Sequence, residues 1–205
     1  MSYTAALFVR FRGQRSYIRS ADVYPLIVTH AGIAGNKVTS DLRIDFARVV
    51  TRCLEVSIFP KDSKQIDRNA AFSFSYNSDG RAMMGFLVET EALVTQRYDS
   101  DDEAIYRRIE LSGDELSVVD PNGNFEPIDM IAALAAMHEH FEPASSGRKW
   151  LIARLEFSEL PPARTTQRLC ARINRRLGKS SIRSSLLLDG REIGRLLMVQ
   201  GVVGV

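Results

Sequence analysis

The chain has 205 residues, 45% hydrophobic and 25% charged, an ordinary composition for a globular protein. That length suits one large domain or two small ones, and it can bury a core without disulfides or metals. No stretch approaches the roughly 20 apolar residues of a membrane-spanning helix, and the N-terminal arginines follow the apolar run instead of preceding it as in a signal peptide, so we expect a cytoplasmic protein without membrane contact.

Cysteine usage bears on what holds the fold together. Cys53 and Cys170 each fall inside an apolar pattern typical of an amphipathic helix. Two cysteines make a poor disulfide framework for a chain of this size, and free cysteine is among the most buried residue types. We therefore expect two buried thiols and no disulfide.

The net charge of +2 conceals an uneven distribution along the chain. Residues 1–54 contain eight Lys/Arg and three Asp/Glu, residues 55–147 contain seven and eighteen, and residues 148–205 contain twelve and four. Two basic ends thus flank an acidic middle. Either the basic ends share a face that binds an anionic partner, or the acidic middle neutralises them within the molecule, and both can hold together.

The first third of the chain mixes strand and helix patterns. Residues 4–12 alternate apolar and polar positions, which predicts a strand. Residues 20–33 begin like a helix, but Pro25 lies too deep for the first turn and argues against a regular one. Residues 40–54 repeat apolar side chains at spacings of three and four, which predicts a helix, and a short strand over residues 55–59 follows.

Two hairpins and a helix are predicted in the acidic middle. Residues 71–76 alternate and return over residues 81–88 after an Asn-Ser-Asp-Gly turn. A second pair of short strands, residues 105–111 and 116–119, encloses a Ser-Gly-Asp-Glu turn. Residues 127–141 then form a helix with proline at its first position.

The last quarter reads as a strand, an arginine-rich helix and a hairpin. Residues 149–157 are the strand, and residues 165–178 are the helix, which ends at a glycine suited to the left-handed C-terminal position. Residues 182–188 and 192–199 flank an Asp-Gly pair, the strongest short-range signal for a hairpin.

Together these elements predict an α+β protein with mostly antiparallel strands and about three main helices. The similar strands near the two ends, each followed by a basic segment and a helix, suggest a ferredoxin-like pairing of N- and C-terminal β-α units. We expect a single domain over residues 1–205. The best linker, at residues 143–147, offers an alternative division into residues 1–142 and 148–205, although the second piece is marginal as an independent core.

No catalytic, metal or cofactor motif stands out. His138 and His140 are two apart, so a helix points them in different directions, and His30 is isolated. Residues 99–103 are rich in carboxylates but lack the glycine of a calcium loop. The chain contains no GxGxxG after a strand, no Walker pattern and no GxSxG elbow. We predict no catalytic residue, no metal site and no cofactor.

The arginines carry the leading functional hypothesis. Arginine holds phosphates with two hydrogen bonds and stacks on bases, so a basic helix and hairpin would bind nucleic acid with little sequence preference. The N-terminal arginines could join this surface if their strand lies beside residues 149–157. The predicted nucleic-acid-binding residues are Arg164, Arg168, Arg172, Arg175, Arg176, Lys179, Arg183, Arg10, Arg12 and Arg15.

The order of strand, arginine-rich helix and Ser/Arg hairpin over the last fifty residues is similar in layout to the CRISPR RNA-processing endoribonucleases. This resemblance rests on order and charge, carries over no catalytic residue, and implies ferredoxin-like halves.

Two other functions stay open. In the first, the protein is a component of an assembly in which its basic end meets an acidic protein surface, including that of a second copy in a homo-oligomer. In the second, it is a small-molecule enzyme with an unrecognised site, which would need a deep pocket holding His30 or the carboxylates.

Overall fold

The computed structural model describes residues 2–202 except 64, 66, 68, 142, 145 and 146, and it describes only the backbone of His140. The chain forms two compact units, residues 1–100 and residues 101–205, and each is described here by itself. The expectation of a single domain, with its alternative division at residues 143–147, stays a prediction.

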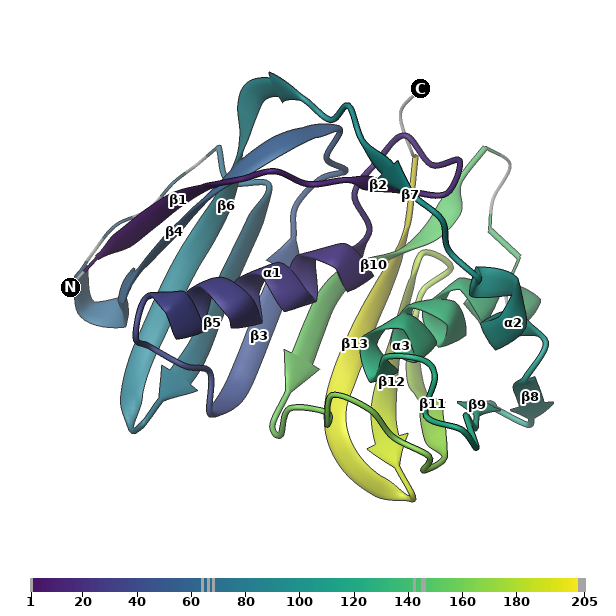
Figure 1. Cartoon of the computed structure of the whole chain (residues 1–205). Helices are drawn as coiled ribbons and strands as arrows, with labels where there is room; N and C mark the ends of the chain where they lie inside the picture. Colours follow the sequence, from purple (N-terminus) through teal and green to yellow (C-terminus); the bar gives the residue numbers. More distant parts are fainter. Residues whose placement is uncertain are drawn as a thin grey trace. The chain divides into compact units, whose positions relative to one another are not determined.

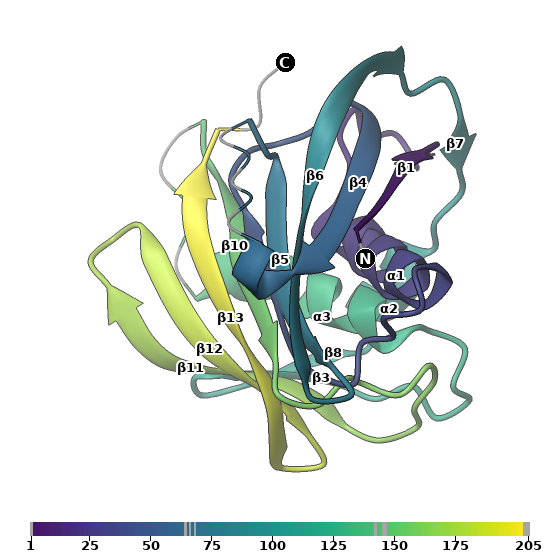
Figure 2. The same ribbon diagram turned by 90° about the vertical axis from the view of Figure 1, so that its left-hand side faces the viewer.

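The first unit is an antiparallel sheet with one long helix. Its sheet has the strand order β1-β4-β6-β5-β3, and β2 and β7 form a separate parallel pair. Figures 1 and 2 show α1 on one face of this sheet. The elements are β1 (Tyr3–Leu7), β2 (Phe11–Arg12), α1 (Ser20–Ile33), β3 (Ser40–Phe46), β4 (Arg52–Pro60), the 3-10 turn η1 (Lys61–Ser63), β5 (Phe72–Ser78), β6 (Arg81–Leu93) and β7 (Arg97–Tyr98).

The core of the first unit follows from two periodicities. Helix α1 buries Val23 and Ile27, which are four apart on one face of the helix. Strand β4 buries Leu54, Val56 and Ile58, which alternate as one face of a strand must. Packing these faces together removes both apolar surfaces from water, at about 25 cal/mol per Å².

The second unit also combines a long helix with an antiparallel sheet, and four strands of its sheet follow that helix; α2 and two short strands precede it. Its sheet has the order β10-β13-β12-β11-β9-β8, all antiparallel. In the first unit β6 lies between β4 and β5, whereas here the last three strands are neighbours in chain order. The elements are α2 (Asp102–Tyr106), β8 (Ile109–Ser112), β9 (Glu115–Val118), α3 (Pro127–Ala136), η2 (Met137–His140), β10 (Lys149–Phe157), β11 (Leu169–Leu177), β12 (Ser181–Leu188) and β13 (Arg191–Gly201).

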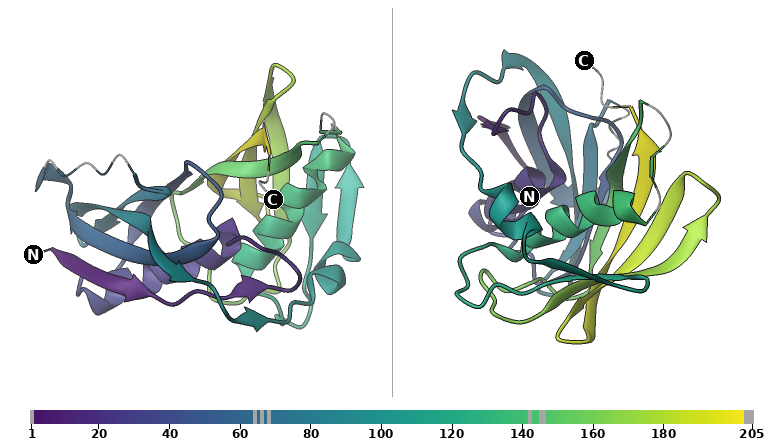
Figure 3. Two further views of the ribbon diagram at one scale, coloured as in Figure 1. Left: turned by 90° about the horizontal axis from the view of Figure 1, so that it is seen from above. Right: turned by 90° about the vertical axis from the view of Figure 1, so that its right-hand side faces the viewer.

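Helix α3 is the centre of the second unit. It buries eight of its ten residues and packs on β9, β10 and β11, as the right-hand view of Figure 3 shows. Asp120 braces the turn before the helix. Its buried carboxylate accepts hydrogen bonds from Arg108 and the amide of Phe125, and these bonds and the neighbouring guanidinium hold the pKa of Asp120 low against the opposing effect of burial.

The α+β class, the mostly antiparallel strands and the number of helices are confirmed, but two of the three predicted amphipathic helices were wrong. Residues 40–54 contain β3 and the start of β4, and residues 165–178 contain β11. In β11, Leu169, Ala171 and Ile173 are buried while Arg172 is exposed, which is a strand alternation that also fits a helical stripe. Pairing with β9 and β12 decides between the two.

The prediction of a ferredoxin-like arrangement was wrong for the same reason, because the described residues from 149 to 202 form strands and no helix. The layout shared with the CRISPR RNA-processing endoribonucleases falls for the same reason. In the opposite direction, α1 is a regular helix despite Pro25, which occupies its sixth position. At that position proline lacks the amide that would donate to the carbonyl of Ala21, so the helix forms with one backbone hydrogen bond fewer.

The three hairpin pairings are confirmed, although residues 105 and 106, predicted as strand, belong to α2, and β8 begins at Ile109. Strands β5 and β6, β8 and β9, and β12 and β13 pair as expected, and Asp79 and Asp189 adopt the positive φ that their Asp-Gly turns require. Cys53 and Cys170 are buried free thiols, also as expected. None of the helices in the described part of the chain is long and apolar enough to cross a membrane.

Candidate functional site

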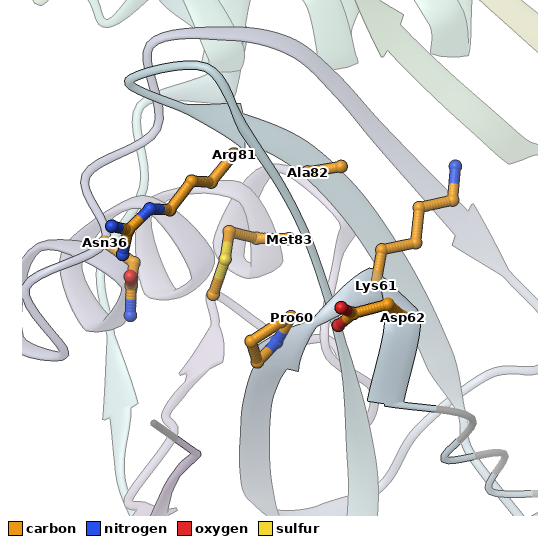
Figure 4. A pocket seen from close by; sticks show the side chains of 7 residues that line it. All are labelled: Asn36, Pro60, Lys61, Asp62, Arg81, Ala82 and Met83. Atoms are coloured by element: carbon orange, nitrogen blue, oxygen red, sulfur yellow. The ribbon is translucent and has the colours of Figure 1, made fainter.

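Two neighbouring pockets lie at one end of the first unit's sheet. The larger has a volume of about 540 Å³, within the range of small-molecule sites. Figure 4 shows Met83 and Pro60 between Arg81 and Asn36 on one side of the view and Lys61 on the other. The lining residues are Asn36, Pro60, Lys61, Asp62, Arg81, Ala82 and Met83.

Local structure places these side chains. Pro60 ends β4 directly opposite Met83 of β6, so both present apolar atoms at the end of the sheet. Asn36 follows α1 and closes its C-terminus, because its amide donates to the carbonyl of Ala31 and its side chain donates to that of Ala34. Strand pairing and helix-end hydrogen bonds therefore fix the backbone of Pro60, Met83 and Asn36 in the wall of the larger pocket.

The smaller pocket, of about 370 Å³, shares Lys61, Ala82 and Met83 with the larger one. Strands β3 and β5 supply the rest of its wall. The residues that only this pocket contains are Asp41, Arg43, Ser75, Tyr76 and Asn77.

Asp41 combines a left-handed backbone conformation with a carboxylate that two neighbouring side chains orient. Its φ is 53°, and unlike Asp79 and Asp189 it lies in a strand at a break in register, not in a hairpin turn. Carboxylate Oδ2 accepts a hydrogen bond of 2.8 Å from the hydroxyl of Ser40 and one of 2.7 Å from the side-chain amide of Asn77. Strained residues cluster at functional sites, so this oriented carboxylate is a candidate reactive group.

Tyr76 is the other notable member of the smaller pocket. It is 2% exposed, and its hydroxyl is the only buried side-chain polar atom in the described residues without a hydrogen-bond partner. Burial raises the pKa of this phenol to about 12, so the group stays protonated and able to donate.

Three cationic side chains line the two pockets, and only one of them has a carboxylate partner among the described residues. Arg43 donates to Asp45 at 2.7 Å and 3.2 Å. Lys61 and Arg81 have no ion pair with any residue that the structure describes. Two cations thus remain available at the pocket mouths for an anionic group of a ligand.

Three of the arginines predicted to bind nucleic acid lie in β11 and two precede it, and four of these five are paired with carboxylates. Glu115 of β9 forms ion pairs with Arg172 at 2.8 Å and with Arg168 at 3.4 Å. The hydrogen bond from Arg172 is the main reason why the pKa of Glu115 is lowered. Arg176 pairs with Asp114 at 2.7 Å, and Arg164 lies 4.0 Å from Glu126.

The remaining predicted residues are divided between the two units. Arg175 and Arg183 lie directly opposite each other on β11 and β12, and Lys179 is in the turn between these strands. In the first unit, Arg10 and Arg12 both lie over the ring of Tyr98, and Arg12 is buried and donates to Ser100. Arg15 accepts a hydrogen bond from Arg97 through its carbonyl.

An enzyme site built on histidine would need His30 in a pocket, and neither pocket contains it. His30 donates to or accepts from the hydroxyl of Tyr3 at 2.8 Å and lines neither pocket. His138 is fully buried and bonded to Ser184 at 2.9 Å, so no solvent reaches this serine-histidine pair. The side chain of His140 lies outside the described residues.

Sequence reasoning missed the pocket residues. Asp41 looked like a helix-start carboxylate because residues 40–54 fit a helical stripe, and Tyr76 looked like one more apolar position of an alternating strand. The Asn-Ser-Asp-Gly turn after Tyr76 was the one available signal, since it brings β5 and β6 together at the end of the sheet where both pockets lie.

No family model and no curated protein matches the chain. Solved structures do match it in fold. A protein of Thermobifida fusca assigned as a thioesterase II aligns with a TM-score of 0.52 at 12% identity, covering 98% of this chain and 92% of that one. The tesB protein of Mycobacterium avium subspecies paratuberculosis aligns with a TM-score of 0.50 at 12% identity, covering 98% and 93%.

The likeness shows a hotdog-type fold. At such identity it shows the fold alone. The prediction of nucleic-acid binding is corrected here, since a solved structure that matches in fold is of a protein assigned as a thioesterase II. The prediction failed physically because its central helix is a strand, whose arginines Glu115 and Asp114 largely neutralise.

Proposed function

We propose that the protein is an enzyme that hydrolyses acyl thioesters. The observation that carries the proposal is the likeness in fold, over 98% of the chain, to a protein assigned as a thioesterase. The pockets of the first unit support it, because they combine apolar walls with an oriented carboxylate. Of the functions that the sequence left open, the proposal therefore takes the small-molecule enzyme in place of nucleic-acid binding.

The smaller pocket supplies a candidate general base. The carboxylate of Asp41, oriented by Ser40 and Asn77, takes a proton from water as the water oxygen attacks the thioester carbonyl carbon. The tetrahedral intermediate collapses by breaking the bond between carbon and sulfur. The departing thiolate recovers the proton from Asp41, which leaves a carboxylic acid and a thiol.

The residues around the two pockets can also bind the acyl chain and the carrier of a thioester. Met83, Ala82 and Pro60 offer apolar contact for a short acyl chain. Lys61 and Arg81 stand at the mouth, where they can hold the phosphates of a carrier such as coenzyme A. A thioester without a phosphate-bearing carrier would lose the contacts with Lys61 and Arg81.

Replacement of Asp41 tests the proposal. Purified protein is incubated with acyl-coenzyme A esters of increasing chain length, and the released thiol is measured with a thiol reagent. We expect Asp41→Asn to lower kcat by about 100-fold or more with little change in KM, because general-base catalysis typically contributes that much.

Asp79→Asn is the matched control, since Asp79 also has a positive φ, which asparagine tolerates, but lies in a turn outside both pockets. It should keep wild-type activity. Absence of hydrolysis of every ester by the wild-type protein would reject the proposed function, and full activity of Asp41→Asn would reject the assigned base.

A further inference from the structure

We propose that two copies of the protein associate through strand β1, which pairs antiparallel with the β1 of the second copy about a two-fold axis at Ala5. This association does not depend on the proposed catalysis, because no residue of β1 lines either pocket. The dimer would extend the sheet of the first unit from one copy into the other.

Strand β1 is a sheet edge with one side free. It ends the strand order of the first unit beside β4, as Figure 2 shows. Successive residues of a strand direct their amides and carbonyls to alternate sides. Among the described residues, only β4 provides backbone hydrogen-bond partners for Tyr3–Leu7. The backbone groups on the other side are therefore available to a further strand.

The composition of β1 does not protect this edge. Edge strands are commonly guarded by charged side chains, proline or a bulge. The sequence Tyr-Thr-Ala-Ala-Leu contains neither a charge nor a proline, and its register with β4 is unbroken from Tyr3 to Leu7. By contrast β8, an end strand of the second unit's sheet, has four residues and includes Glu110. Of these two strands, β1 is the one suited to pairing with a further chain.

Phe8 adds an apolar side chain at the end of β1. It is 88% exposed, the largest exposed fraction among the exposed large apolar side chains that the structure describes. Its neighbours Leu7 and Val9 are buried, so the alternation of the strand continues through this position. Phe8 therefore lies on the same outward side as the exposed Thr4 and Ala6. A partner that covers this side would remove the ring from water.

Antiparallel pairing centred on Ala5 is self-complementary. It places Thr4 of each copy opposite Ala6 of the other, and Phe8 opposite Ser2. Thr4 of the second copy then becomes the diagonal neighbour of Phe8 on the outward side, within reach of an aromatic ring. Because Thr4 and Ala6 are small, they leave room for the ring beside them.

The charges beside the edge fit the same symmetry. On β4, Glu55 lies opposite Ala6 and Ser57 lies opposite Thr4. The two-fold arrangement places Glu55 of one copy in the same row as Ser57 of the other, so the two carboxylates do not oppose each other. This match of the edge to itself is the reason for choosing a second copy as the partner.

The association is tested first by measuring mass against concentration. One pair of short strands with two phenylalanines makes a small interface, so we expect a reversible dimer with a Kd on the order of 10 µM. Sedimentation velocity should show a change from monomer to dimer between concentrations about tenfold below and tenfold above that value. A monomer throughout this range would overturn the proposal and leave the edge to an extended segment of another protein.

Phe8→Asp removes the apolar contact from both copies at once. We expect it to raise the Kd by about 100-fold or more, because two phenylalanine side chains leave the interface. The melting temperature of the dilute monomer should not change, since Phe8 is largely exposed. Leu111→Asp is the matched control: Leu111 is 55% exposed, lies on β8, and should be replaceable without effect on the dimer. An unchanged Kd in Phe8→Asp, or equal weakening by both variants, would show that the copies meet elsewhere.

Hydrogen exchange then tests the pairing of the backbones. Residues 2–8 should exchange more slowly at concentrations that form the dimer than in the dilute monomer, because amides on the free side of β1 gain partners. Residues 109–112 of β8 should exchange equally at both concentrations. A dimer that leaves the exchange of residues 2–8 unchanged would contradict association through β1.

Discussion

His138 and Ser184 show what burial does to single residues that look reactive. The Nδ1 atom of His138 lies 2.9 Å from the carbonyl oxygen of Leu134, which can only accept, so Nδ1 carries the proton. Nε2 then accepts from the hydroxyl of Ser184. Burial holds the pKa of His138 below 6.5, which keeps the imidazole neutral, and this pair serves stability because substrate cannot reach it.

This lowered pKa predicts a loss of stability in acid. The unfolded chain binds a proton at His138 near pH 6.5 and the folded chain does not, so the free energy of unfolding falls as pH drops from 6.5 through the folded pKa. Each unit of pKa difference contributes about 1.4 kcal/mol. Urea denaturation at several pH values between 5 and 8 should show this slope.

The slope should be smaller in His138→Gln, which has no group to titrate. Ser184→Ala is the control, because it loses a hydrogen bond but keeps the imidazole and should therefore keep the slope. Parallel pH profiles for the wild-type protein and His138→Gln would contradict the assignment.

At the scale of elements, both units place a phenylalanine opposite a glycine of the neighbouring strand. Phe74 faces Gly85 in the first unit, and Phe157 faces Gly194 in the second. A Cβ atom on Gly85 would lie 2.3 Å from both the Phe74 ring and the carbonyl oxygen of Ser57, and one on Gly194 would lie 2.2 Å from the carbonyl oxygen of Glu156. These glycines are therefore required by close approach and not by turn geometry.

Gly85→Ala should destabilise the protein by about 1–3 kcal/mol, the usual effect of overpacking a dense core. Thermal denaturation checks this. Gly32→Ala is the control: no atom within 4 Å would meet its added Cβ, and alanine suits a helix better than glycine by about 0.5–1 kcal/mol. Equal melting temperatures for the two variants would show that β5 and β6 can separate enough to admit the methyl group.

The elements also show how far local patterns reach. The Asp-Gly turns at 79–80 and 189–190 impose a positive φ on residues next to each other in sequence, so both hairpins could be predicted. The arginine-rich stretch could not, since the apolar positions around Ile173 fit a helix and a strand alike. Its strand form depends on β9, about fifty residues earlier, and β12, which follows it.

At the scale of the whole molecule, the uneven charge of the sequence is balanced within the second unit. Residues 101–205 contain fourteen Lys/Arg and fifteen Asp/Glu, although residues 148–205 alone are strongly basic. Glu115 and Asp114, from the acidic middle, pair with arginines of β11. Of the two readings of the charge pattern, internal neutralisation is the one seen here, while a protein partner, a homo-oligomer and the cytoplasmic location stay predictions.

A double-mutant cycle on Glu115→Gln and Arg172→Gln should measure this balance. Because Arg172 is more than half exposed, we expect a coupling of only about 0.5–1 kcal/mol, and it should shrink in 1 M NaCl. The same cycle with Arg175→Gln in place of Arg172→Gln is the control and should be additive. A coupling that is absent at low salt, or that salt leaves unchanged, would contradict an electrostatic contact.

The sequence by itself determined the α+β class, the three hairpins, helix α3, the free cysteines and the split of charge, because each depends on neighbours along the chain or on composition. Only the tertiary structure decided that residues 40–46 and 169–177 are strands, that in each unit four strands of the main sheet follow a long helix, and that Asp41 and Tyr76 line one pocket. The physical reason is shared: a strand satisfies its backbone hydrogen bonds through partners distant in sequence, so neither the strand nor a site built on its end is visible in a local pattern.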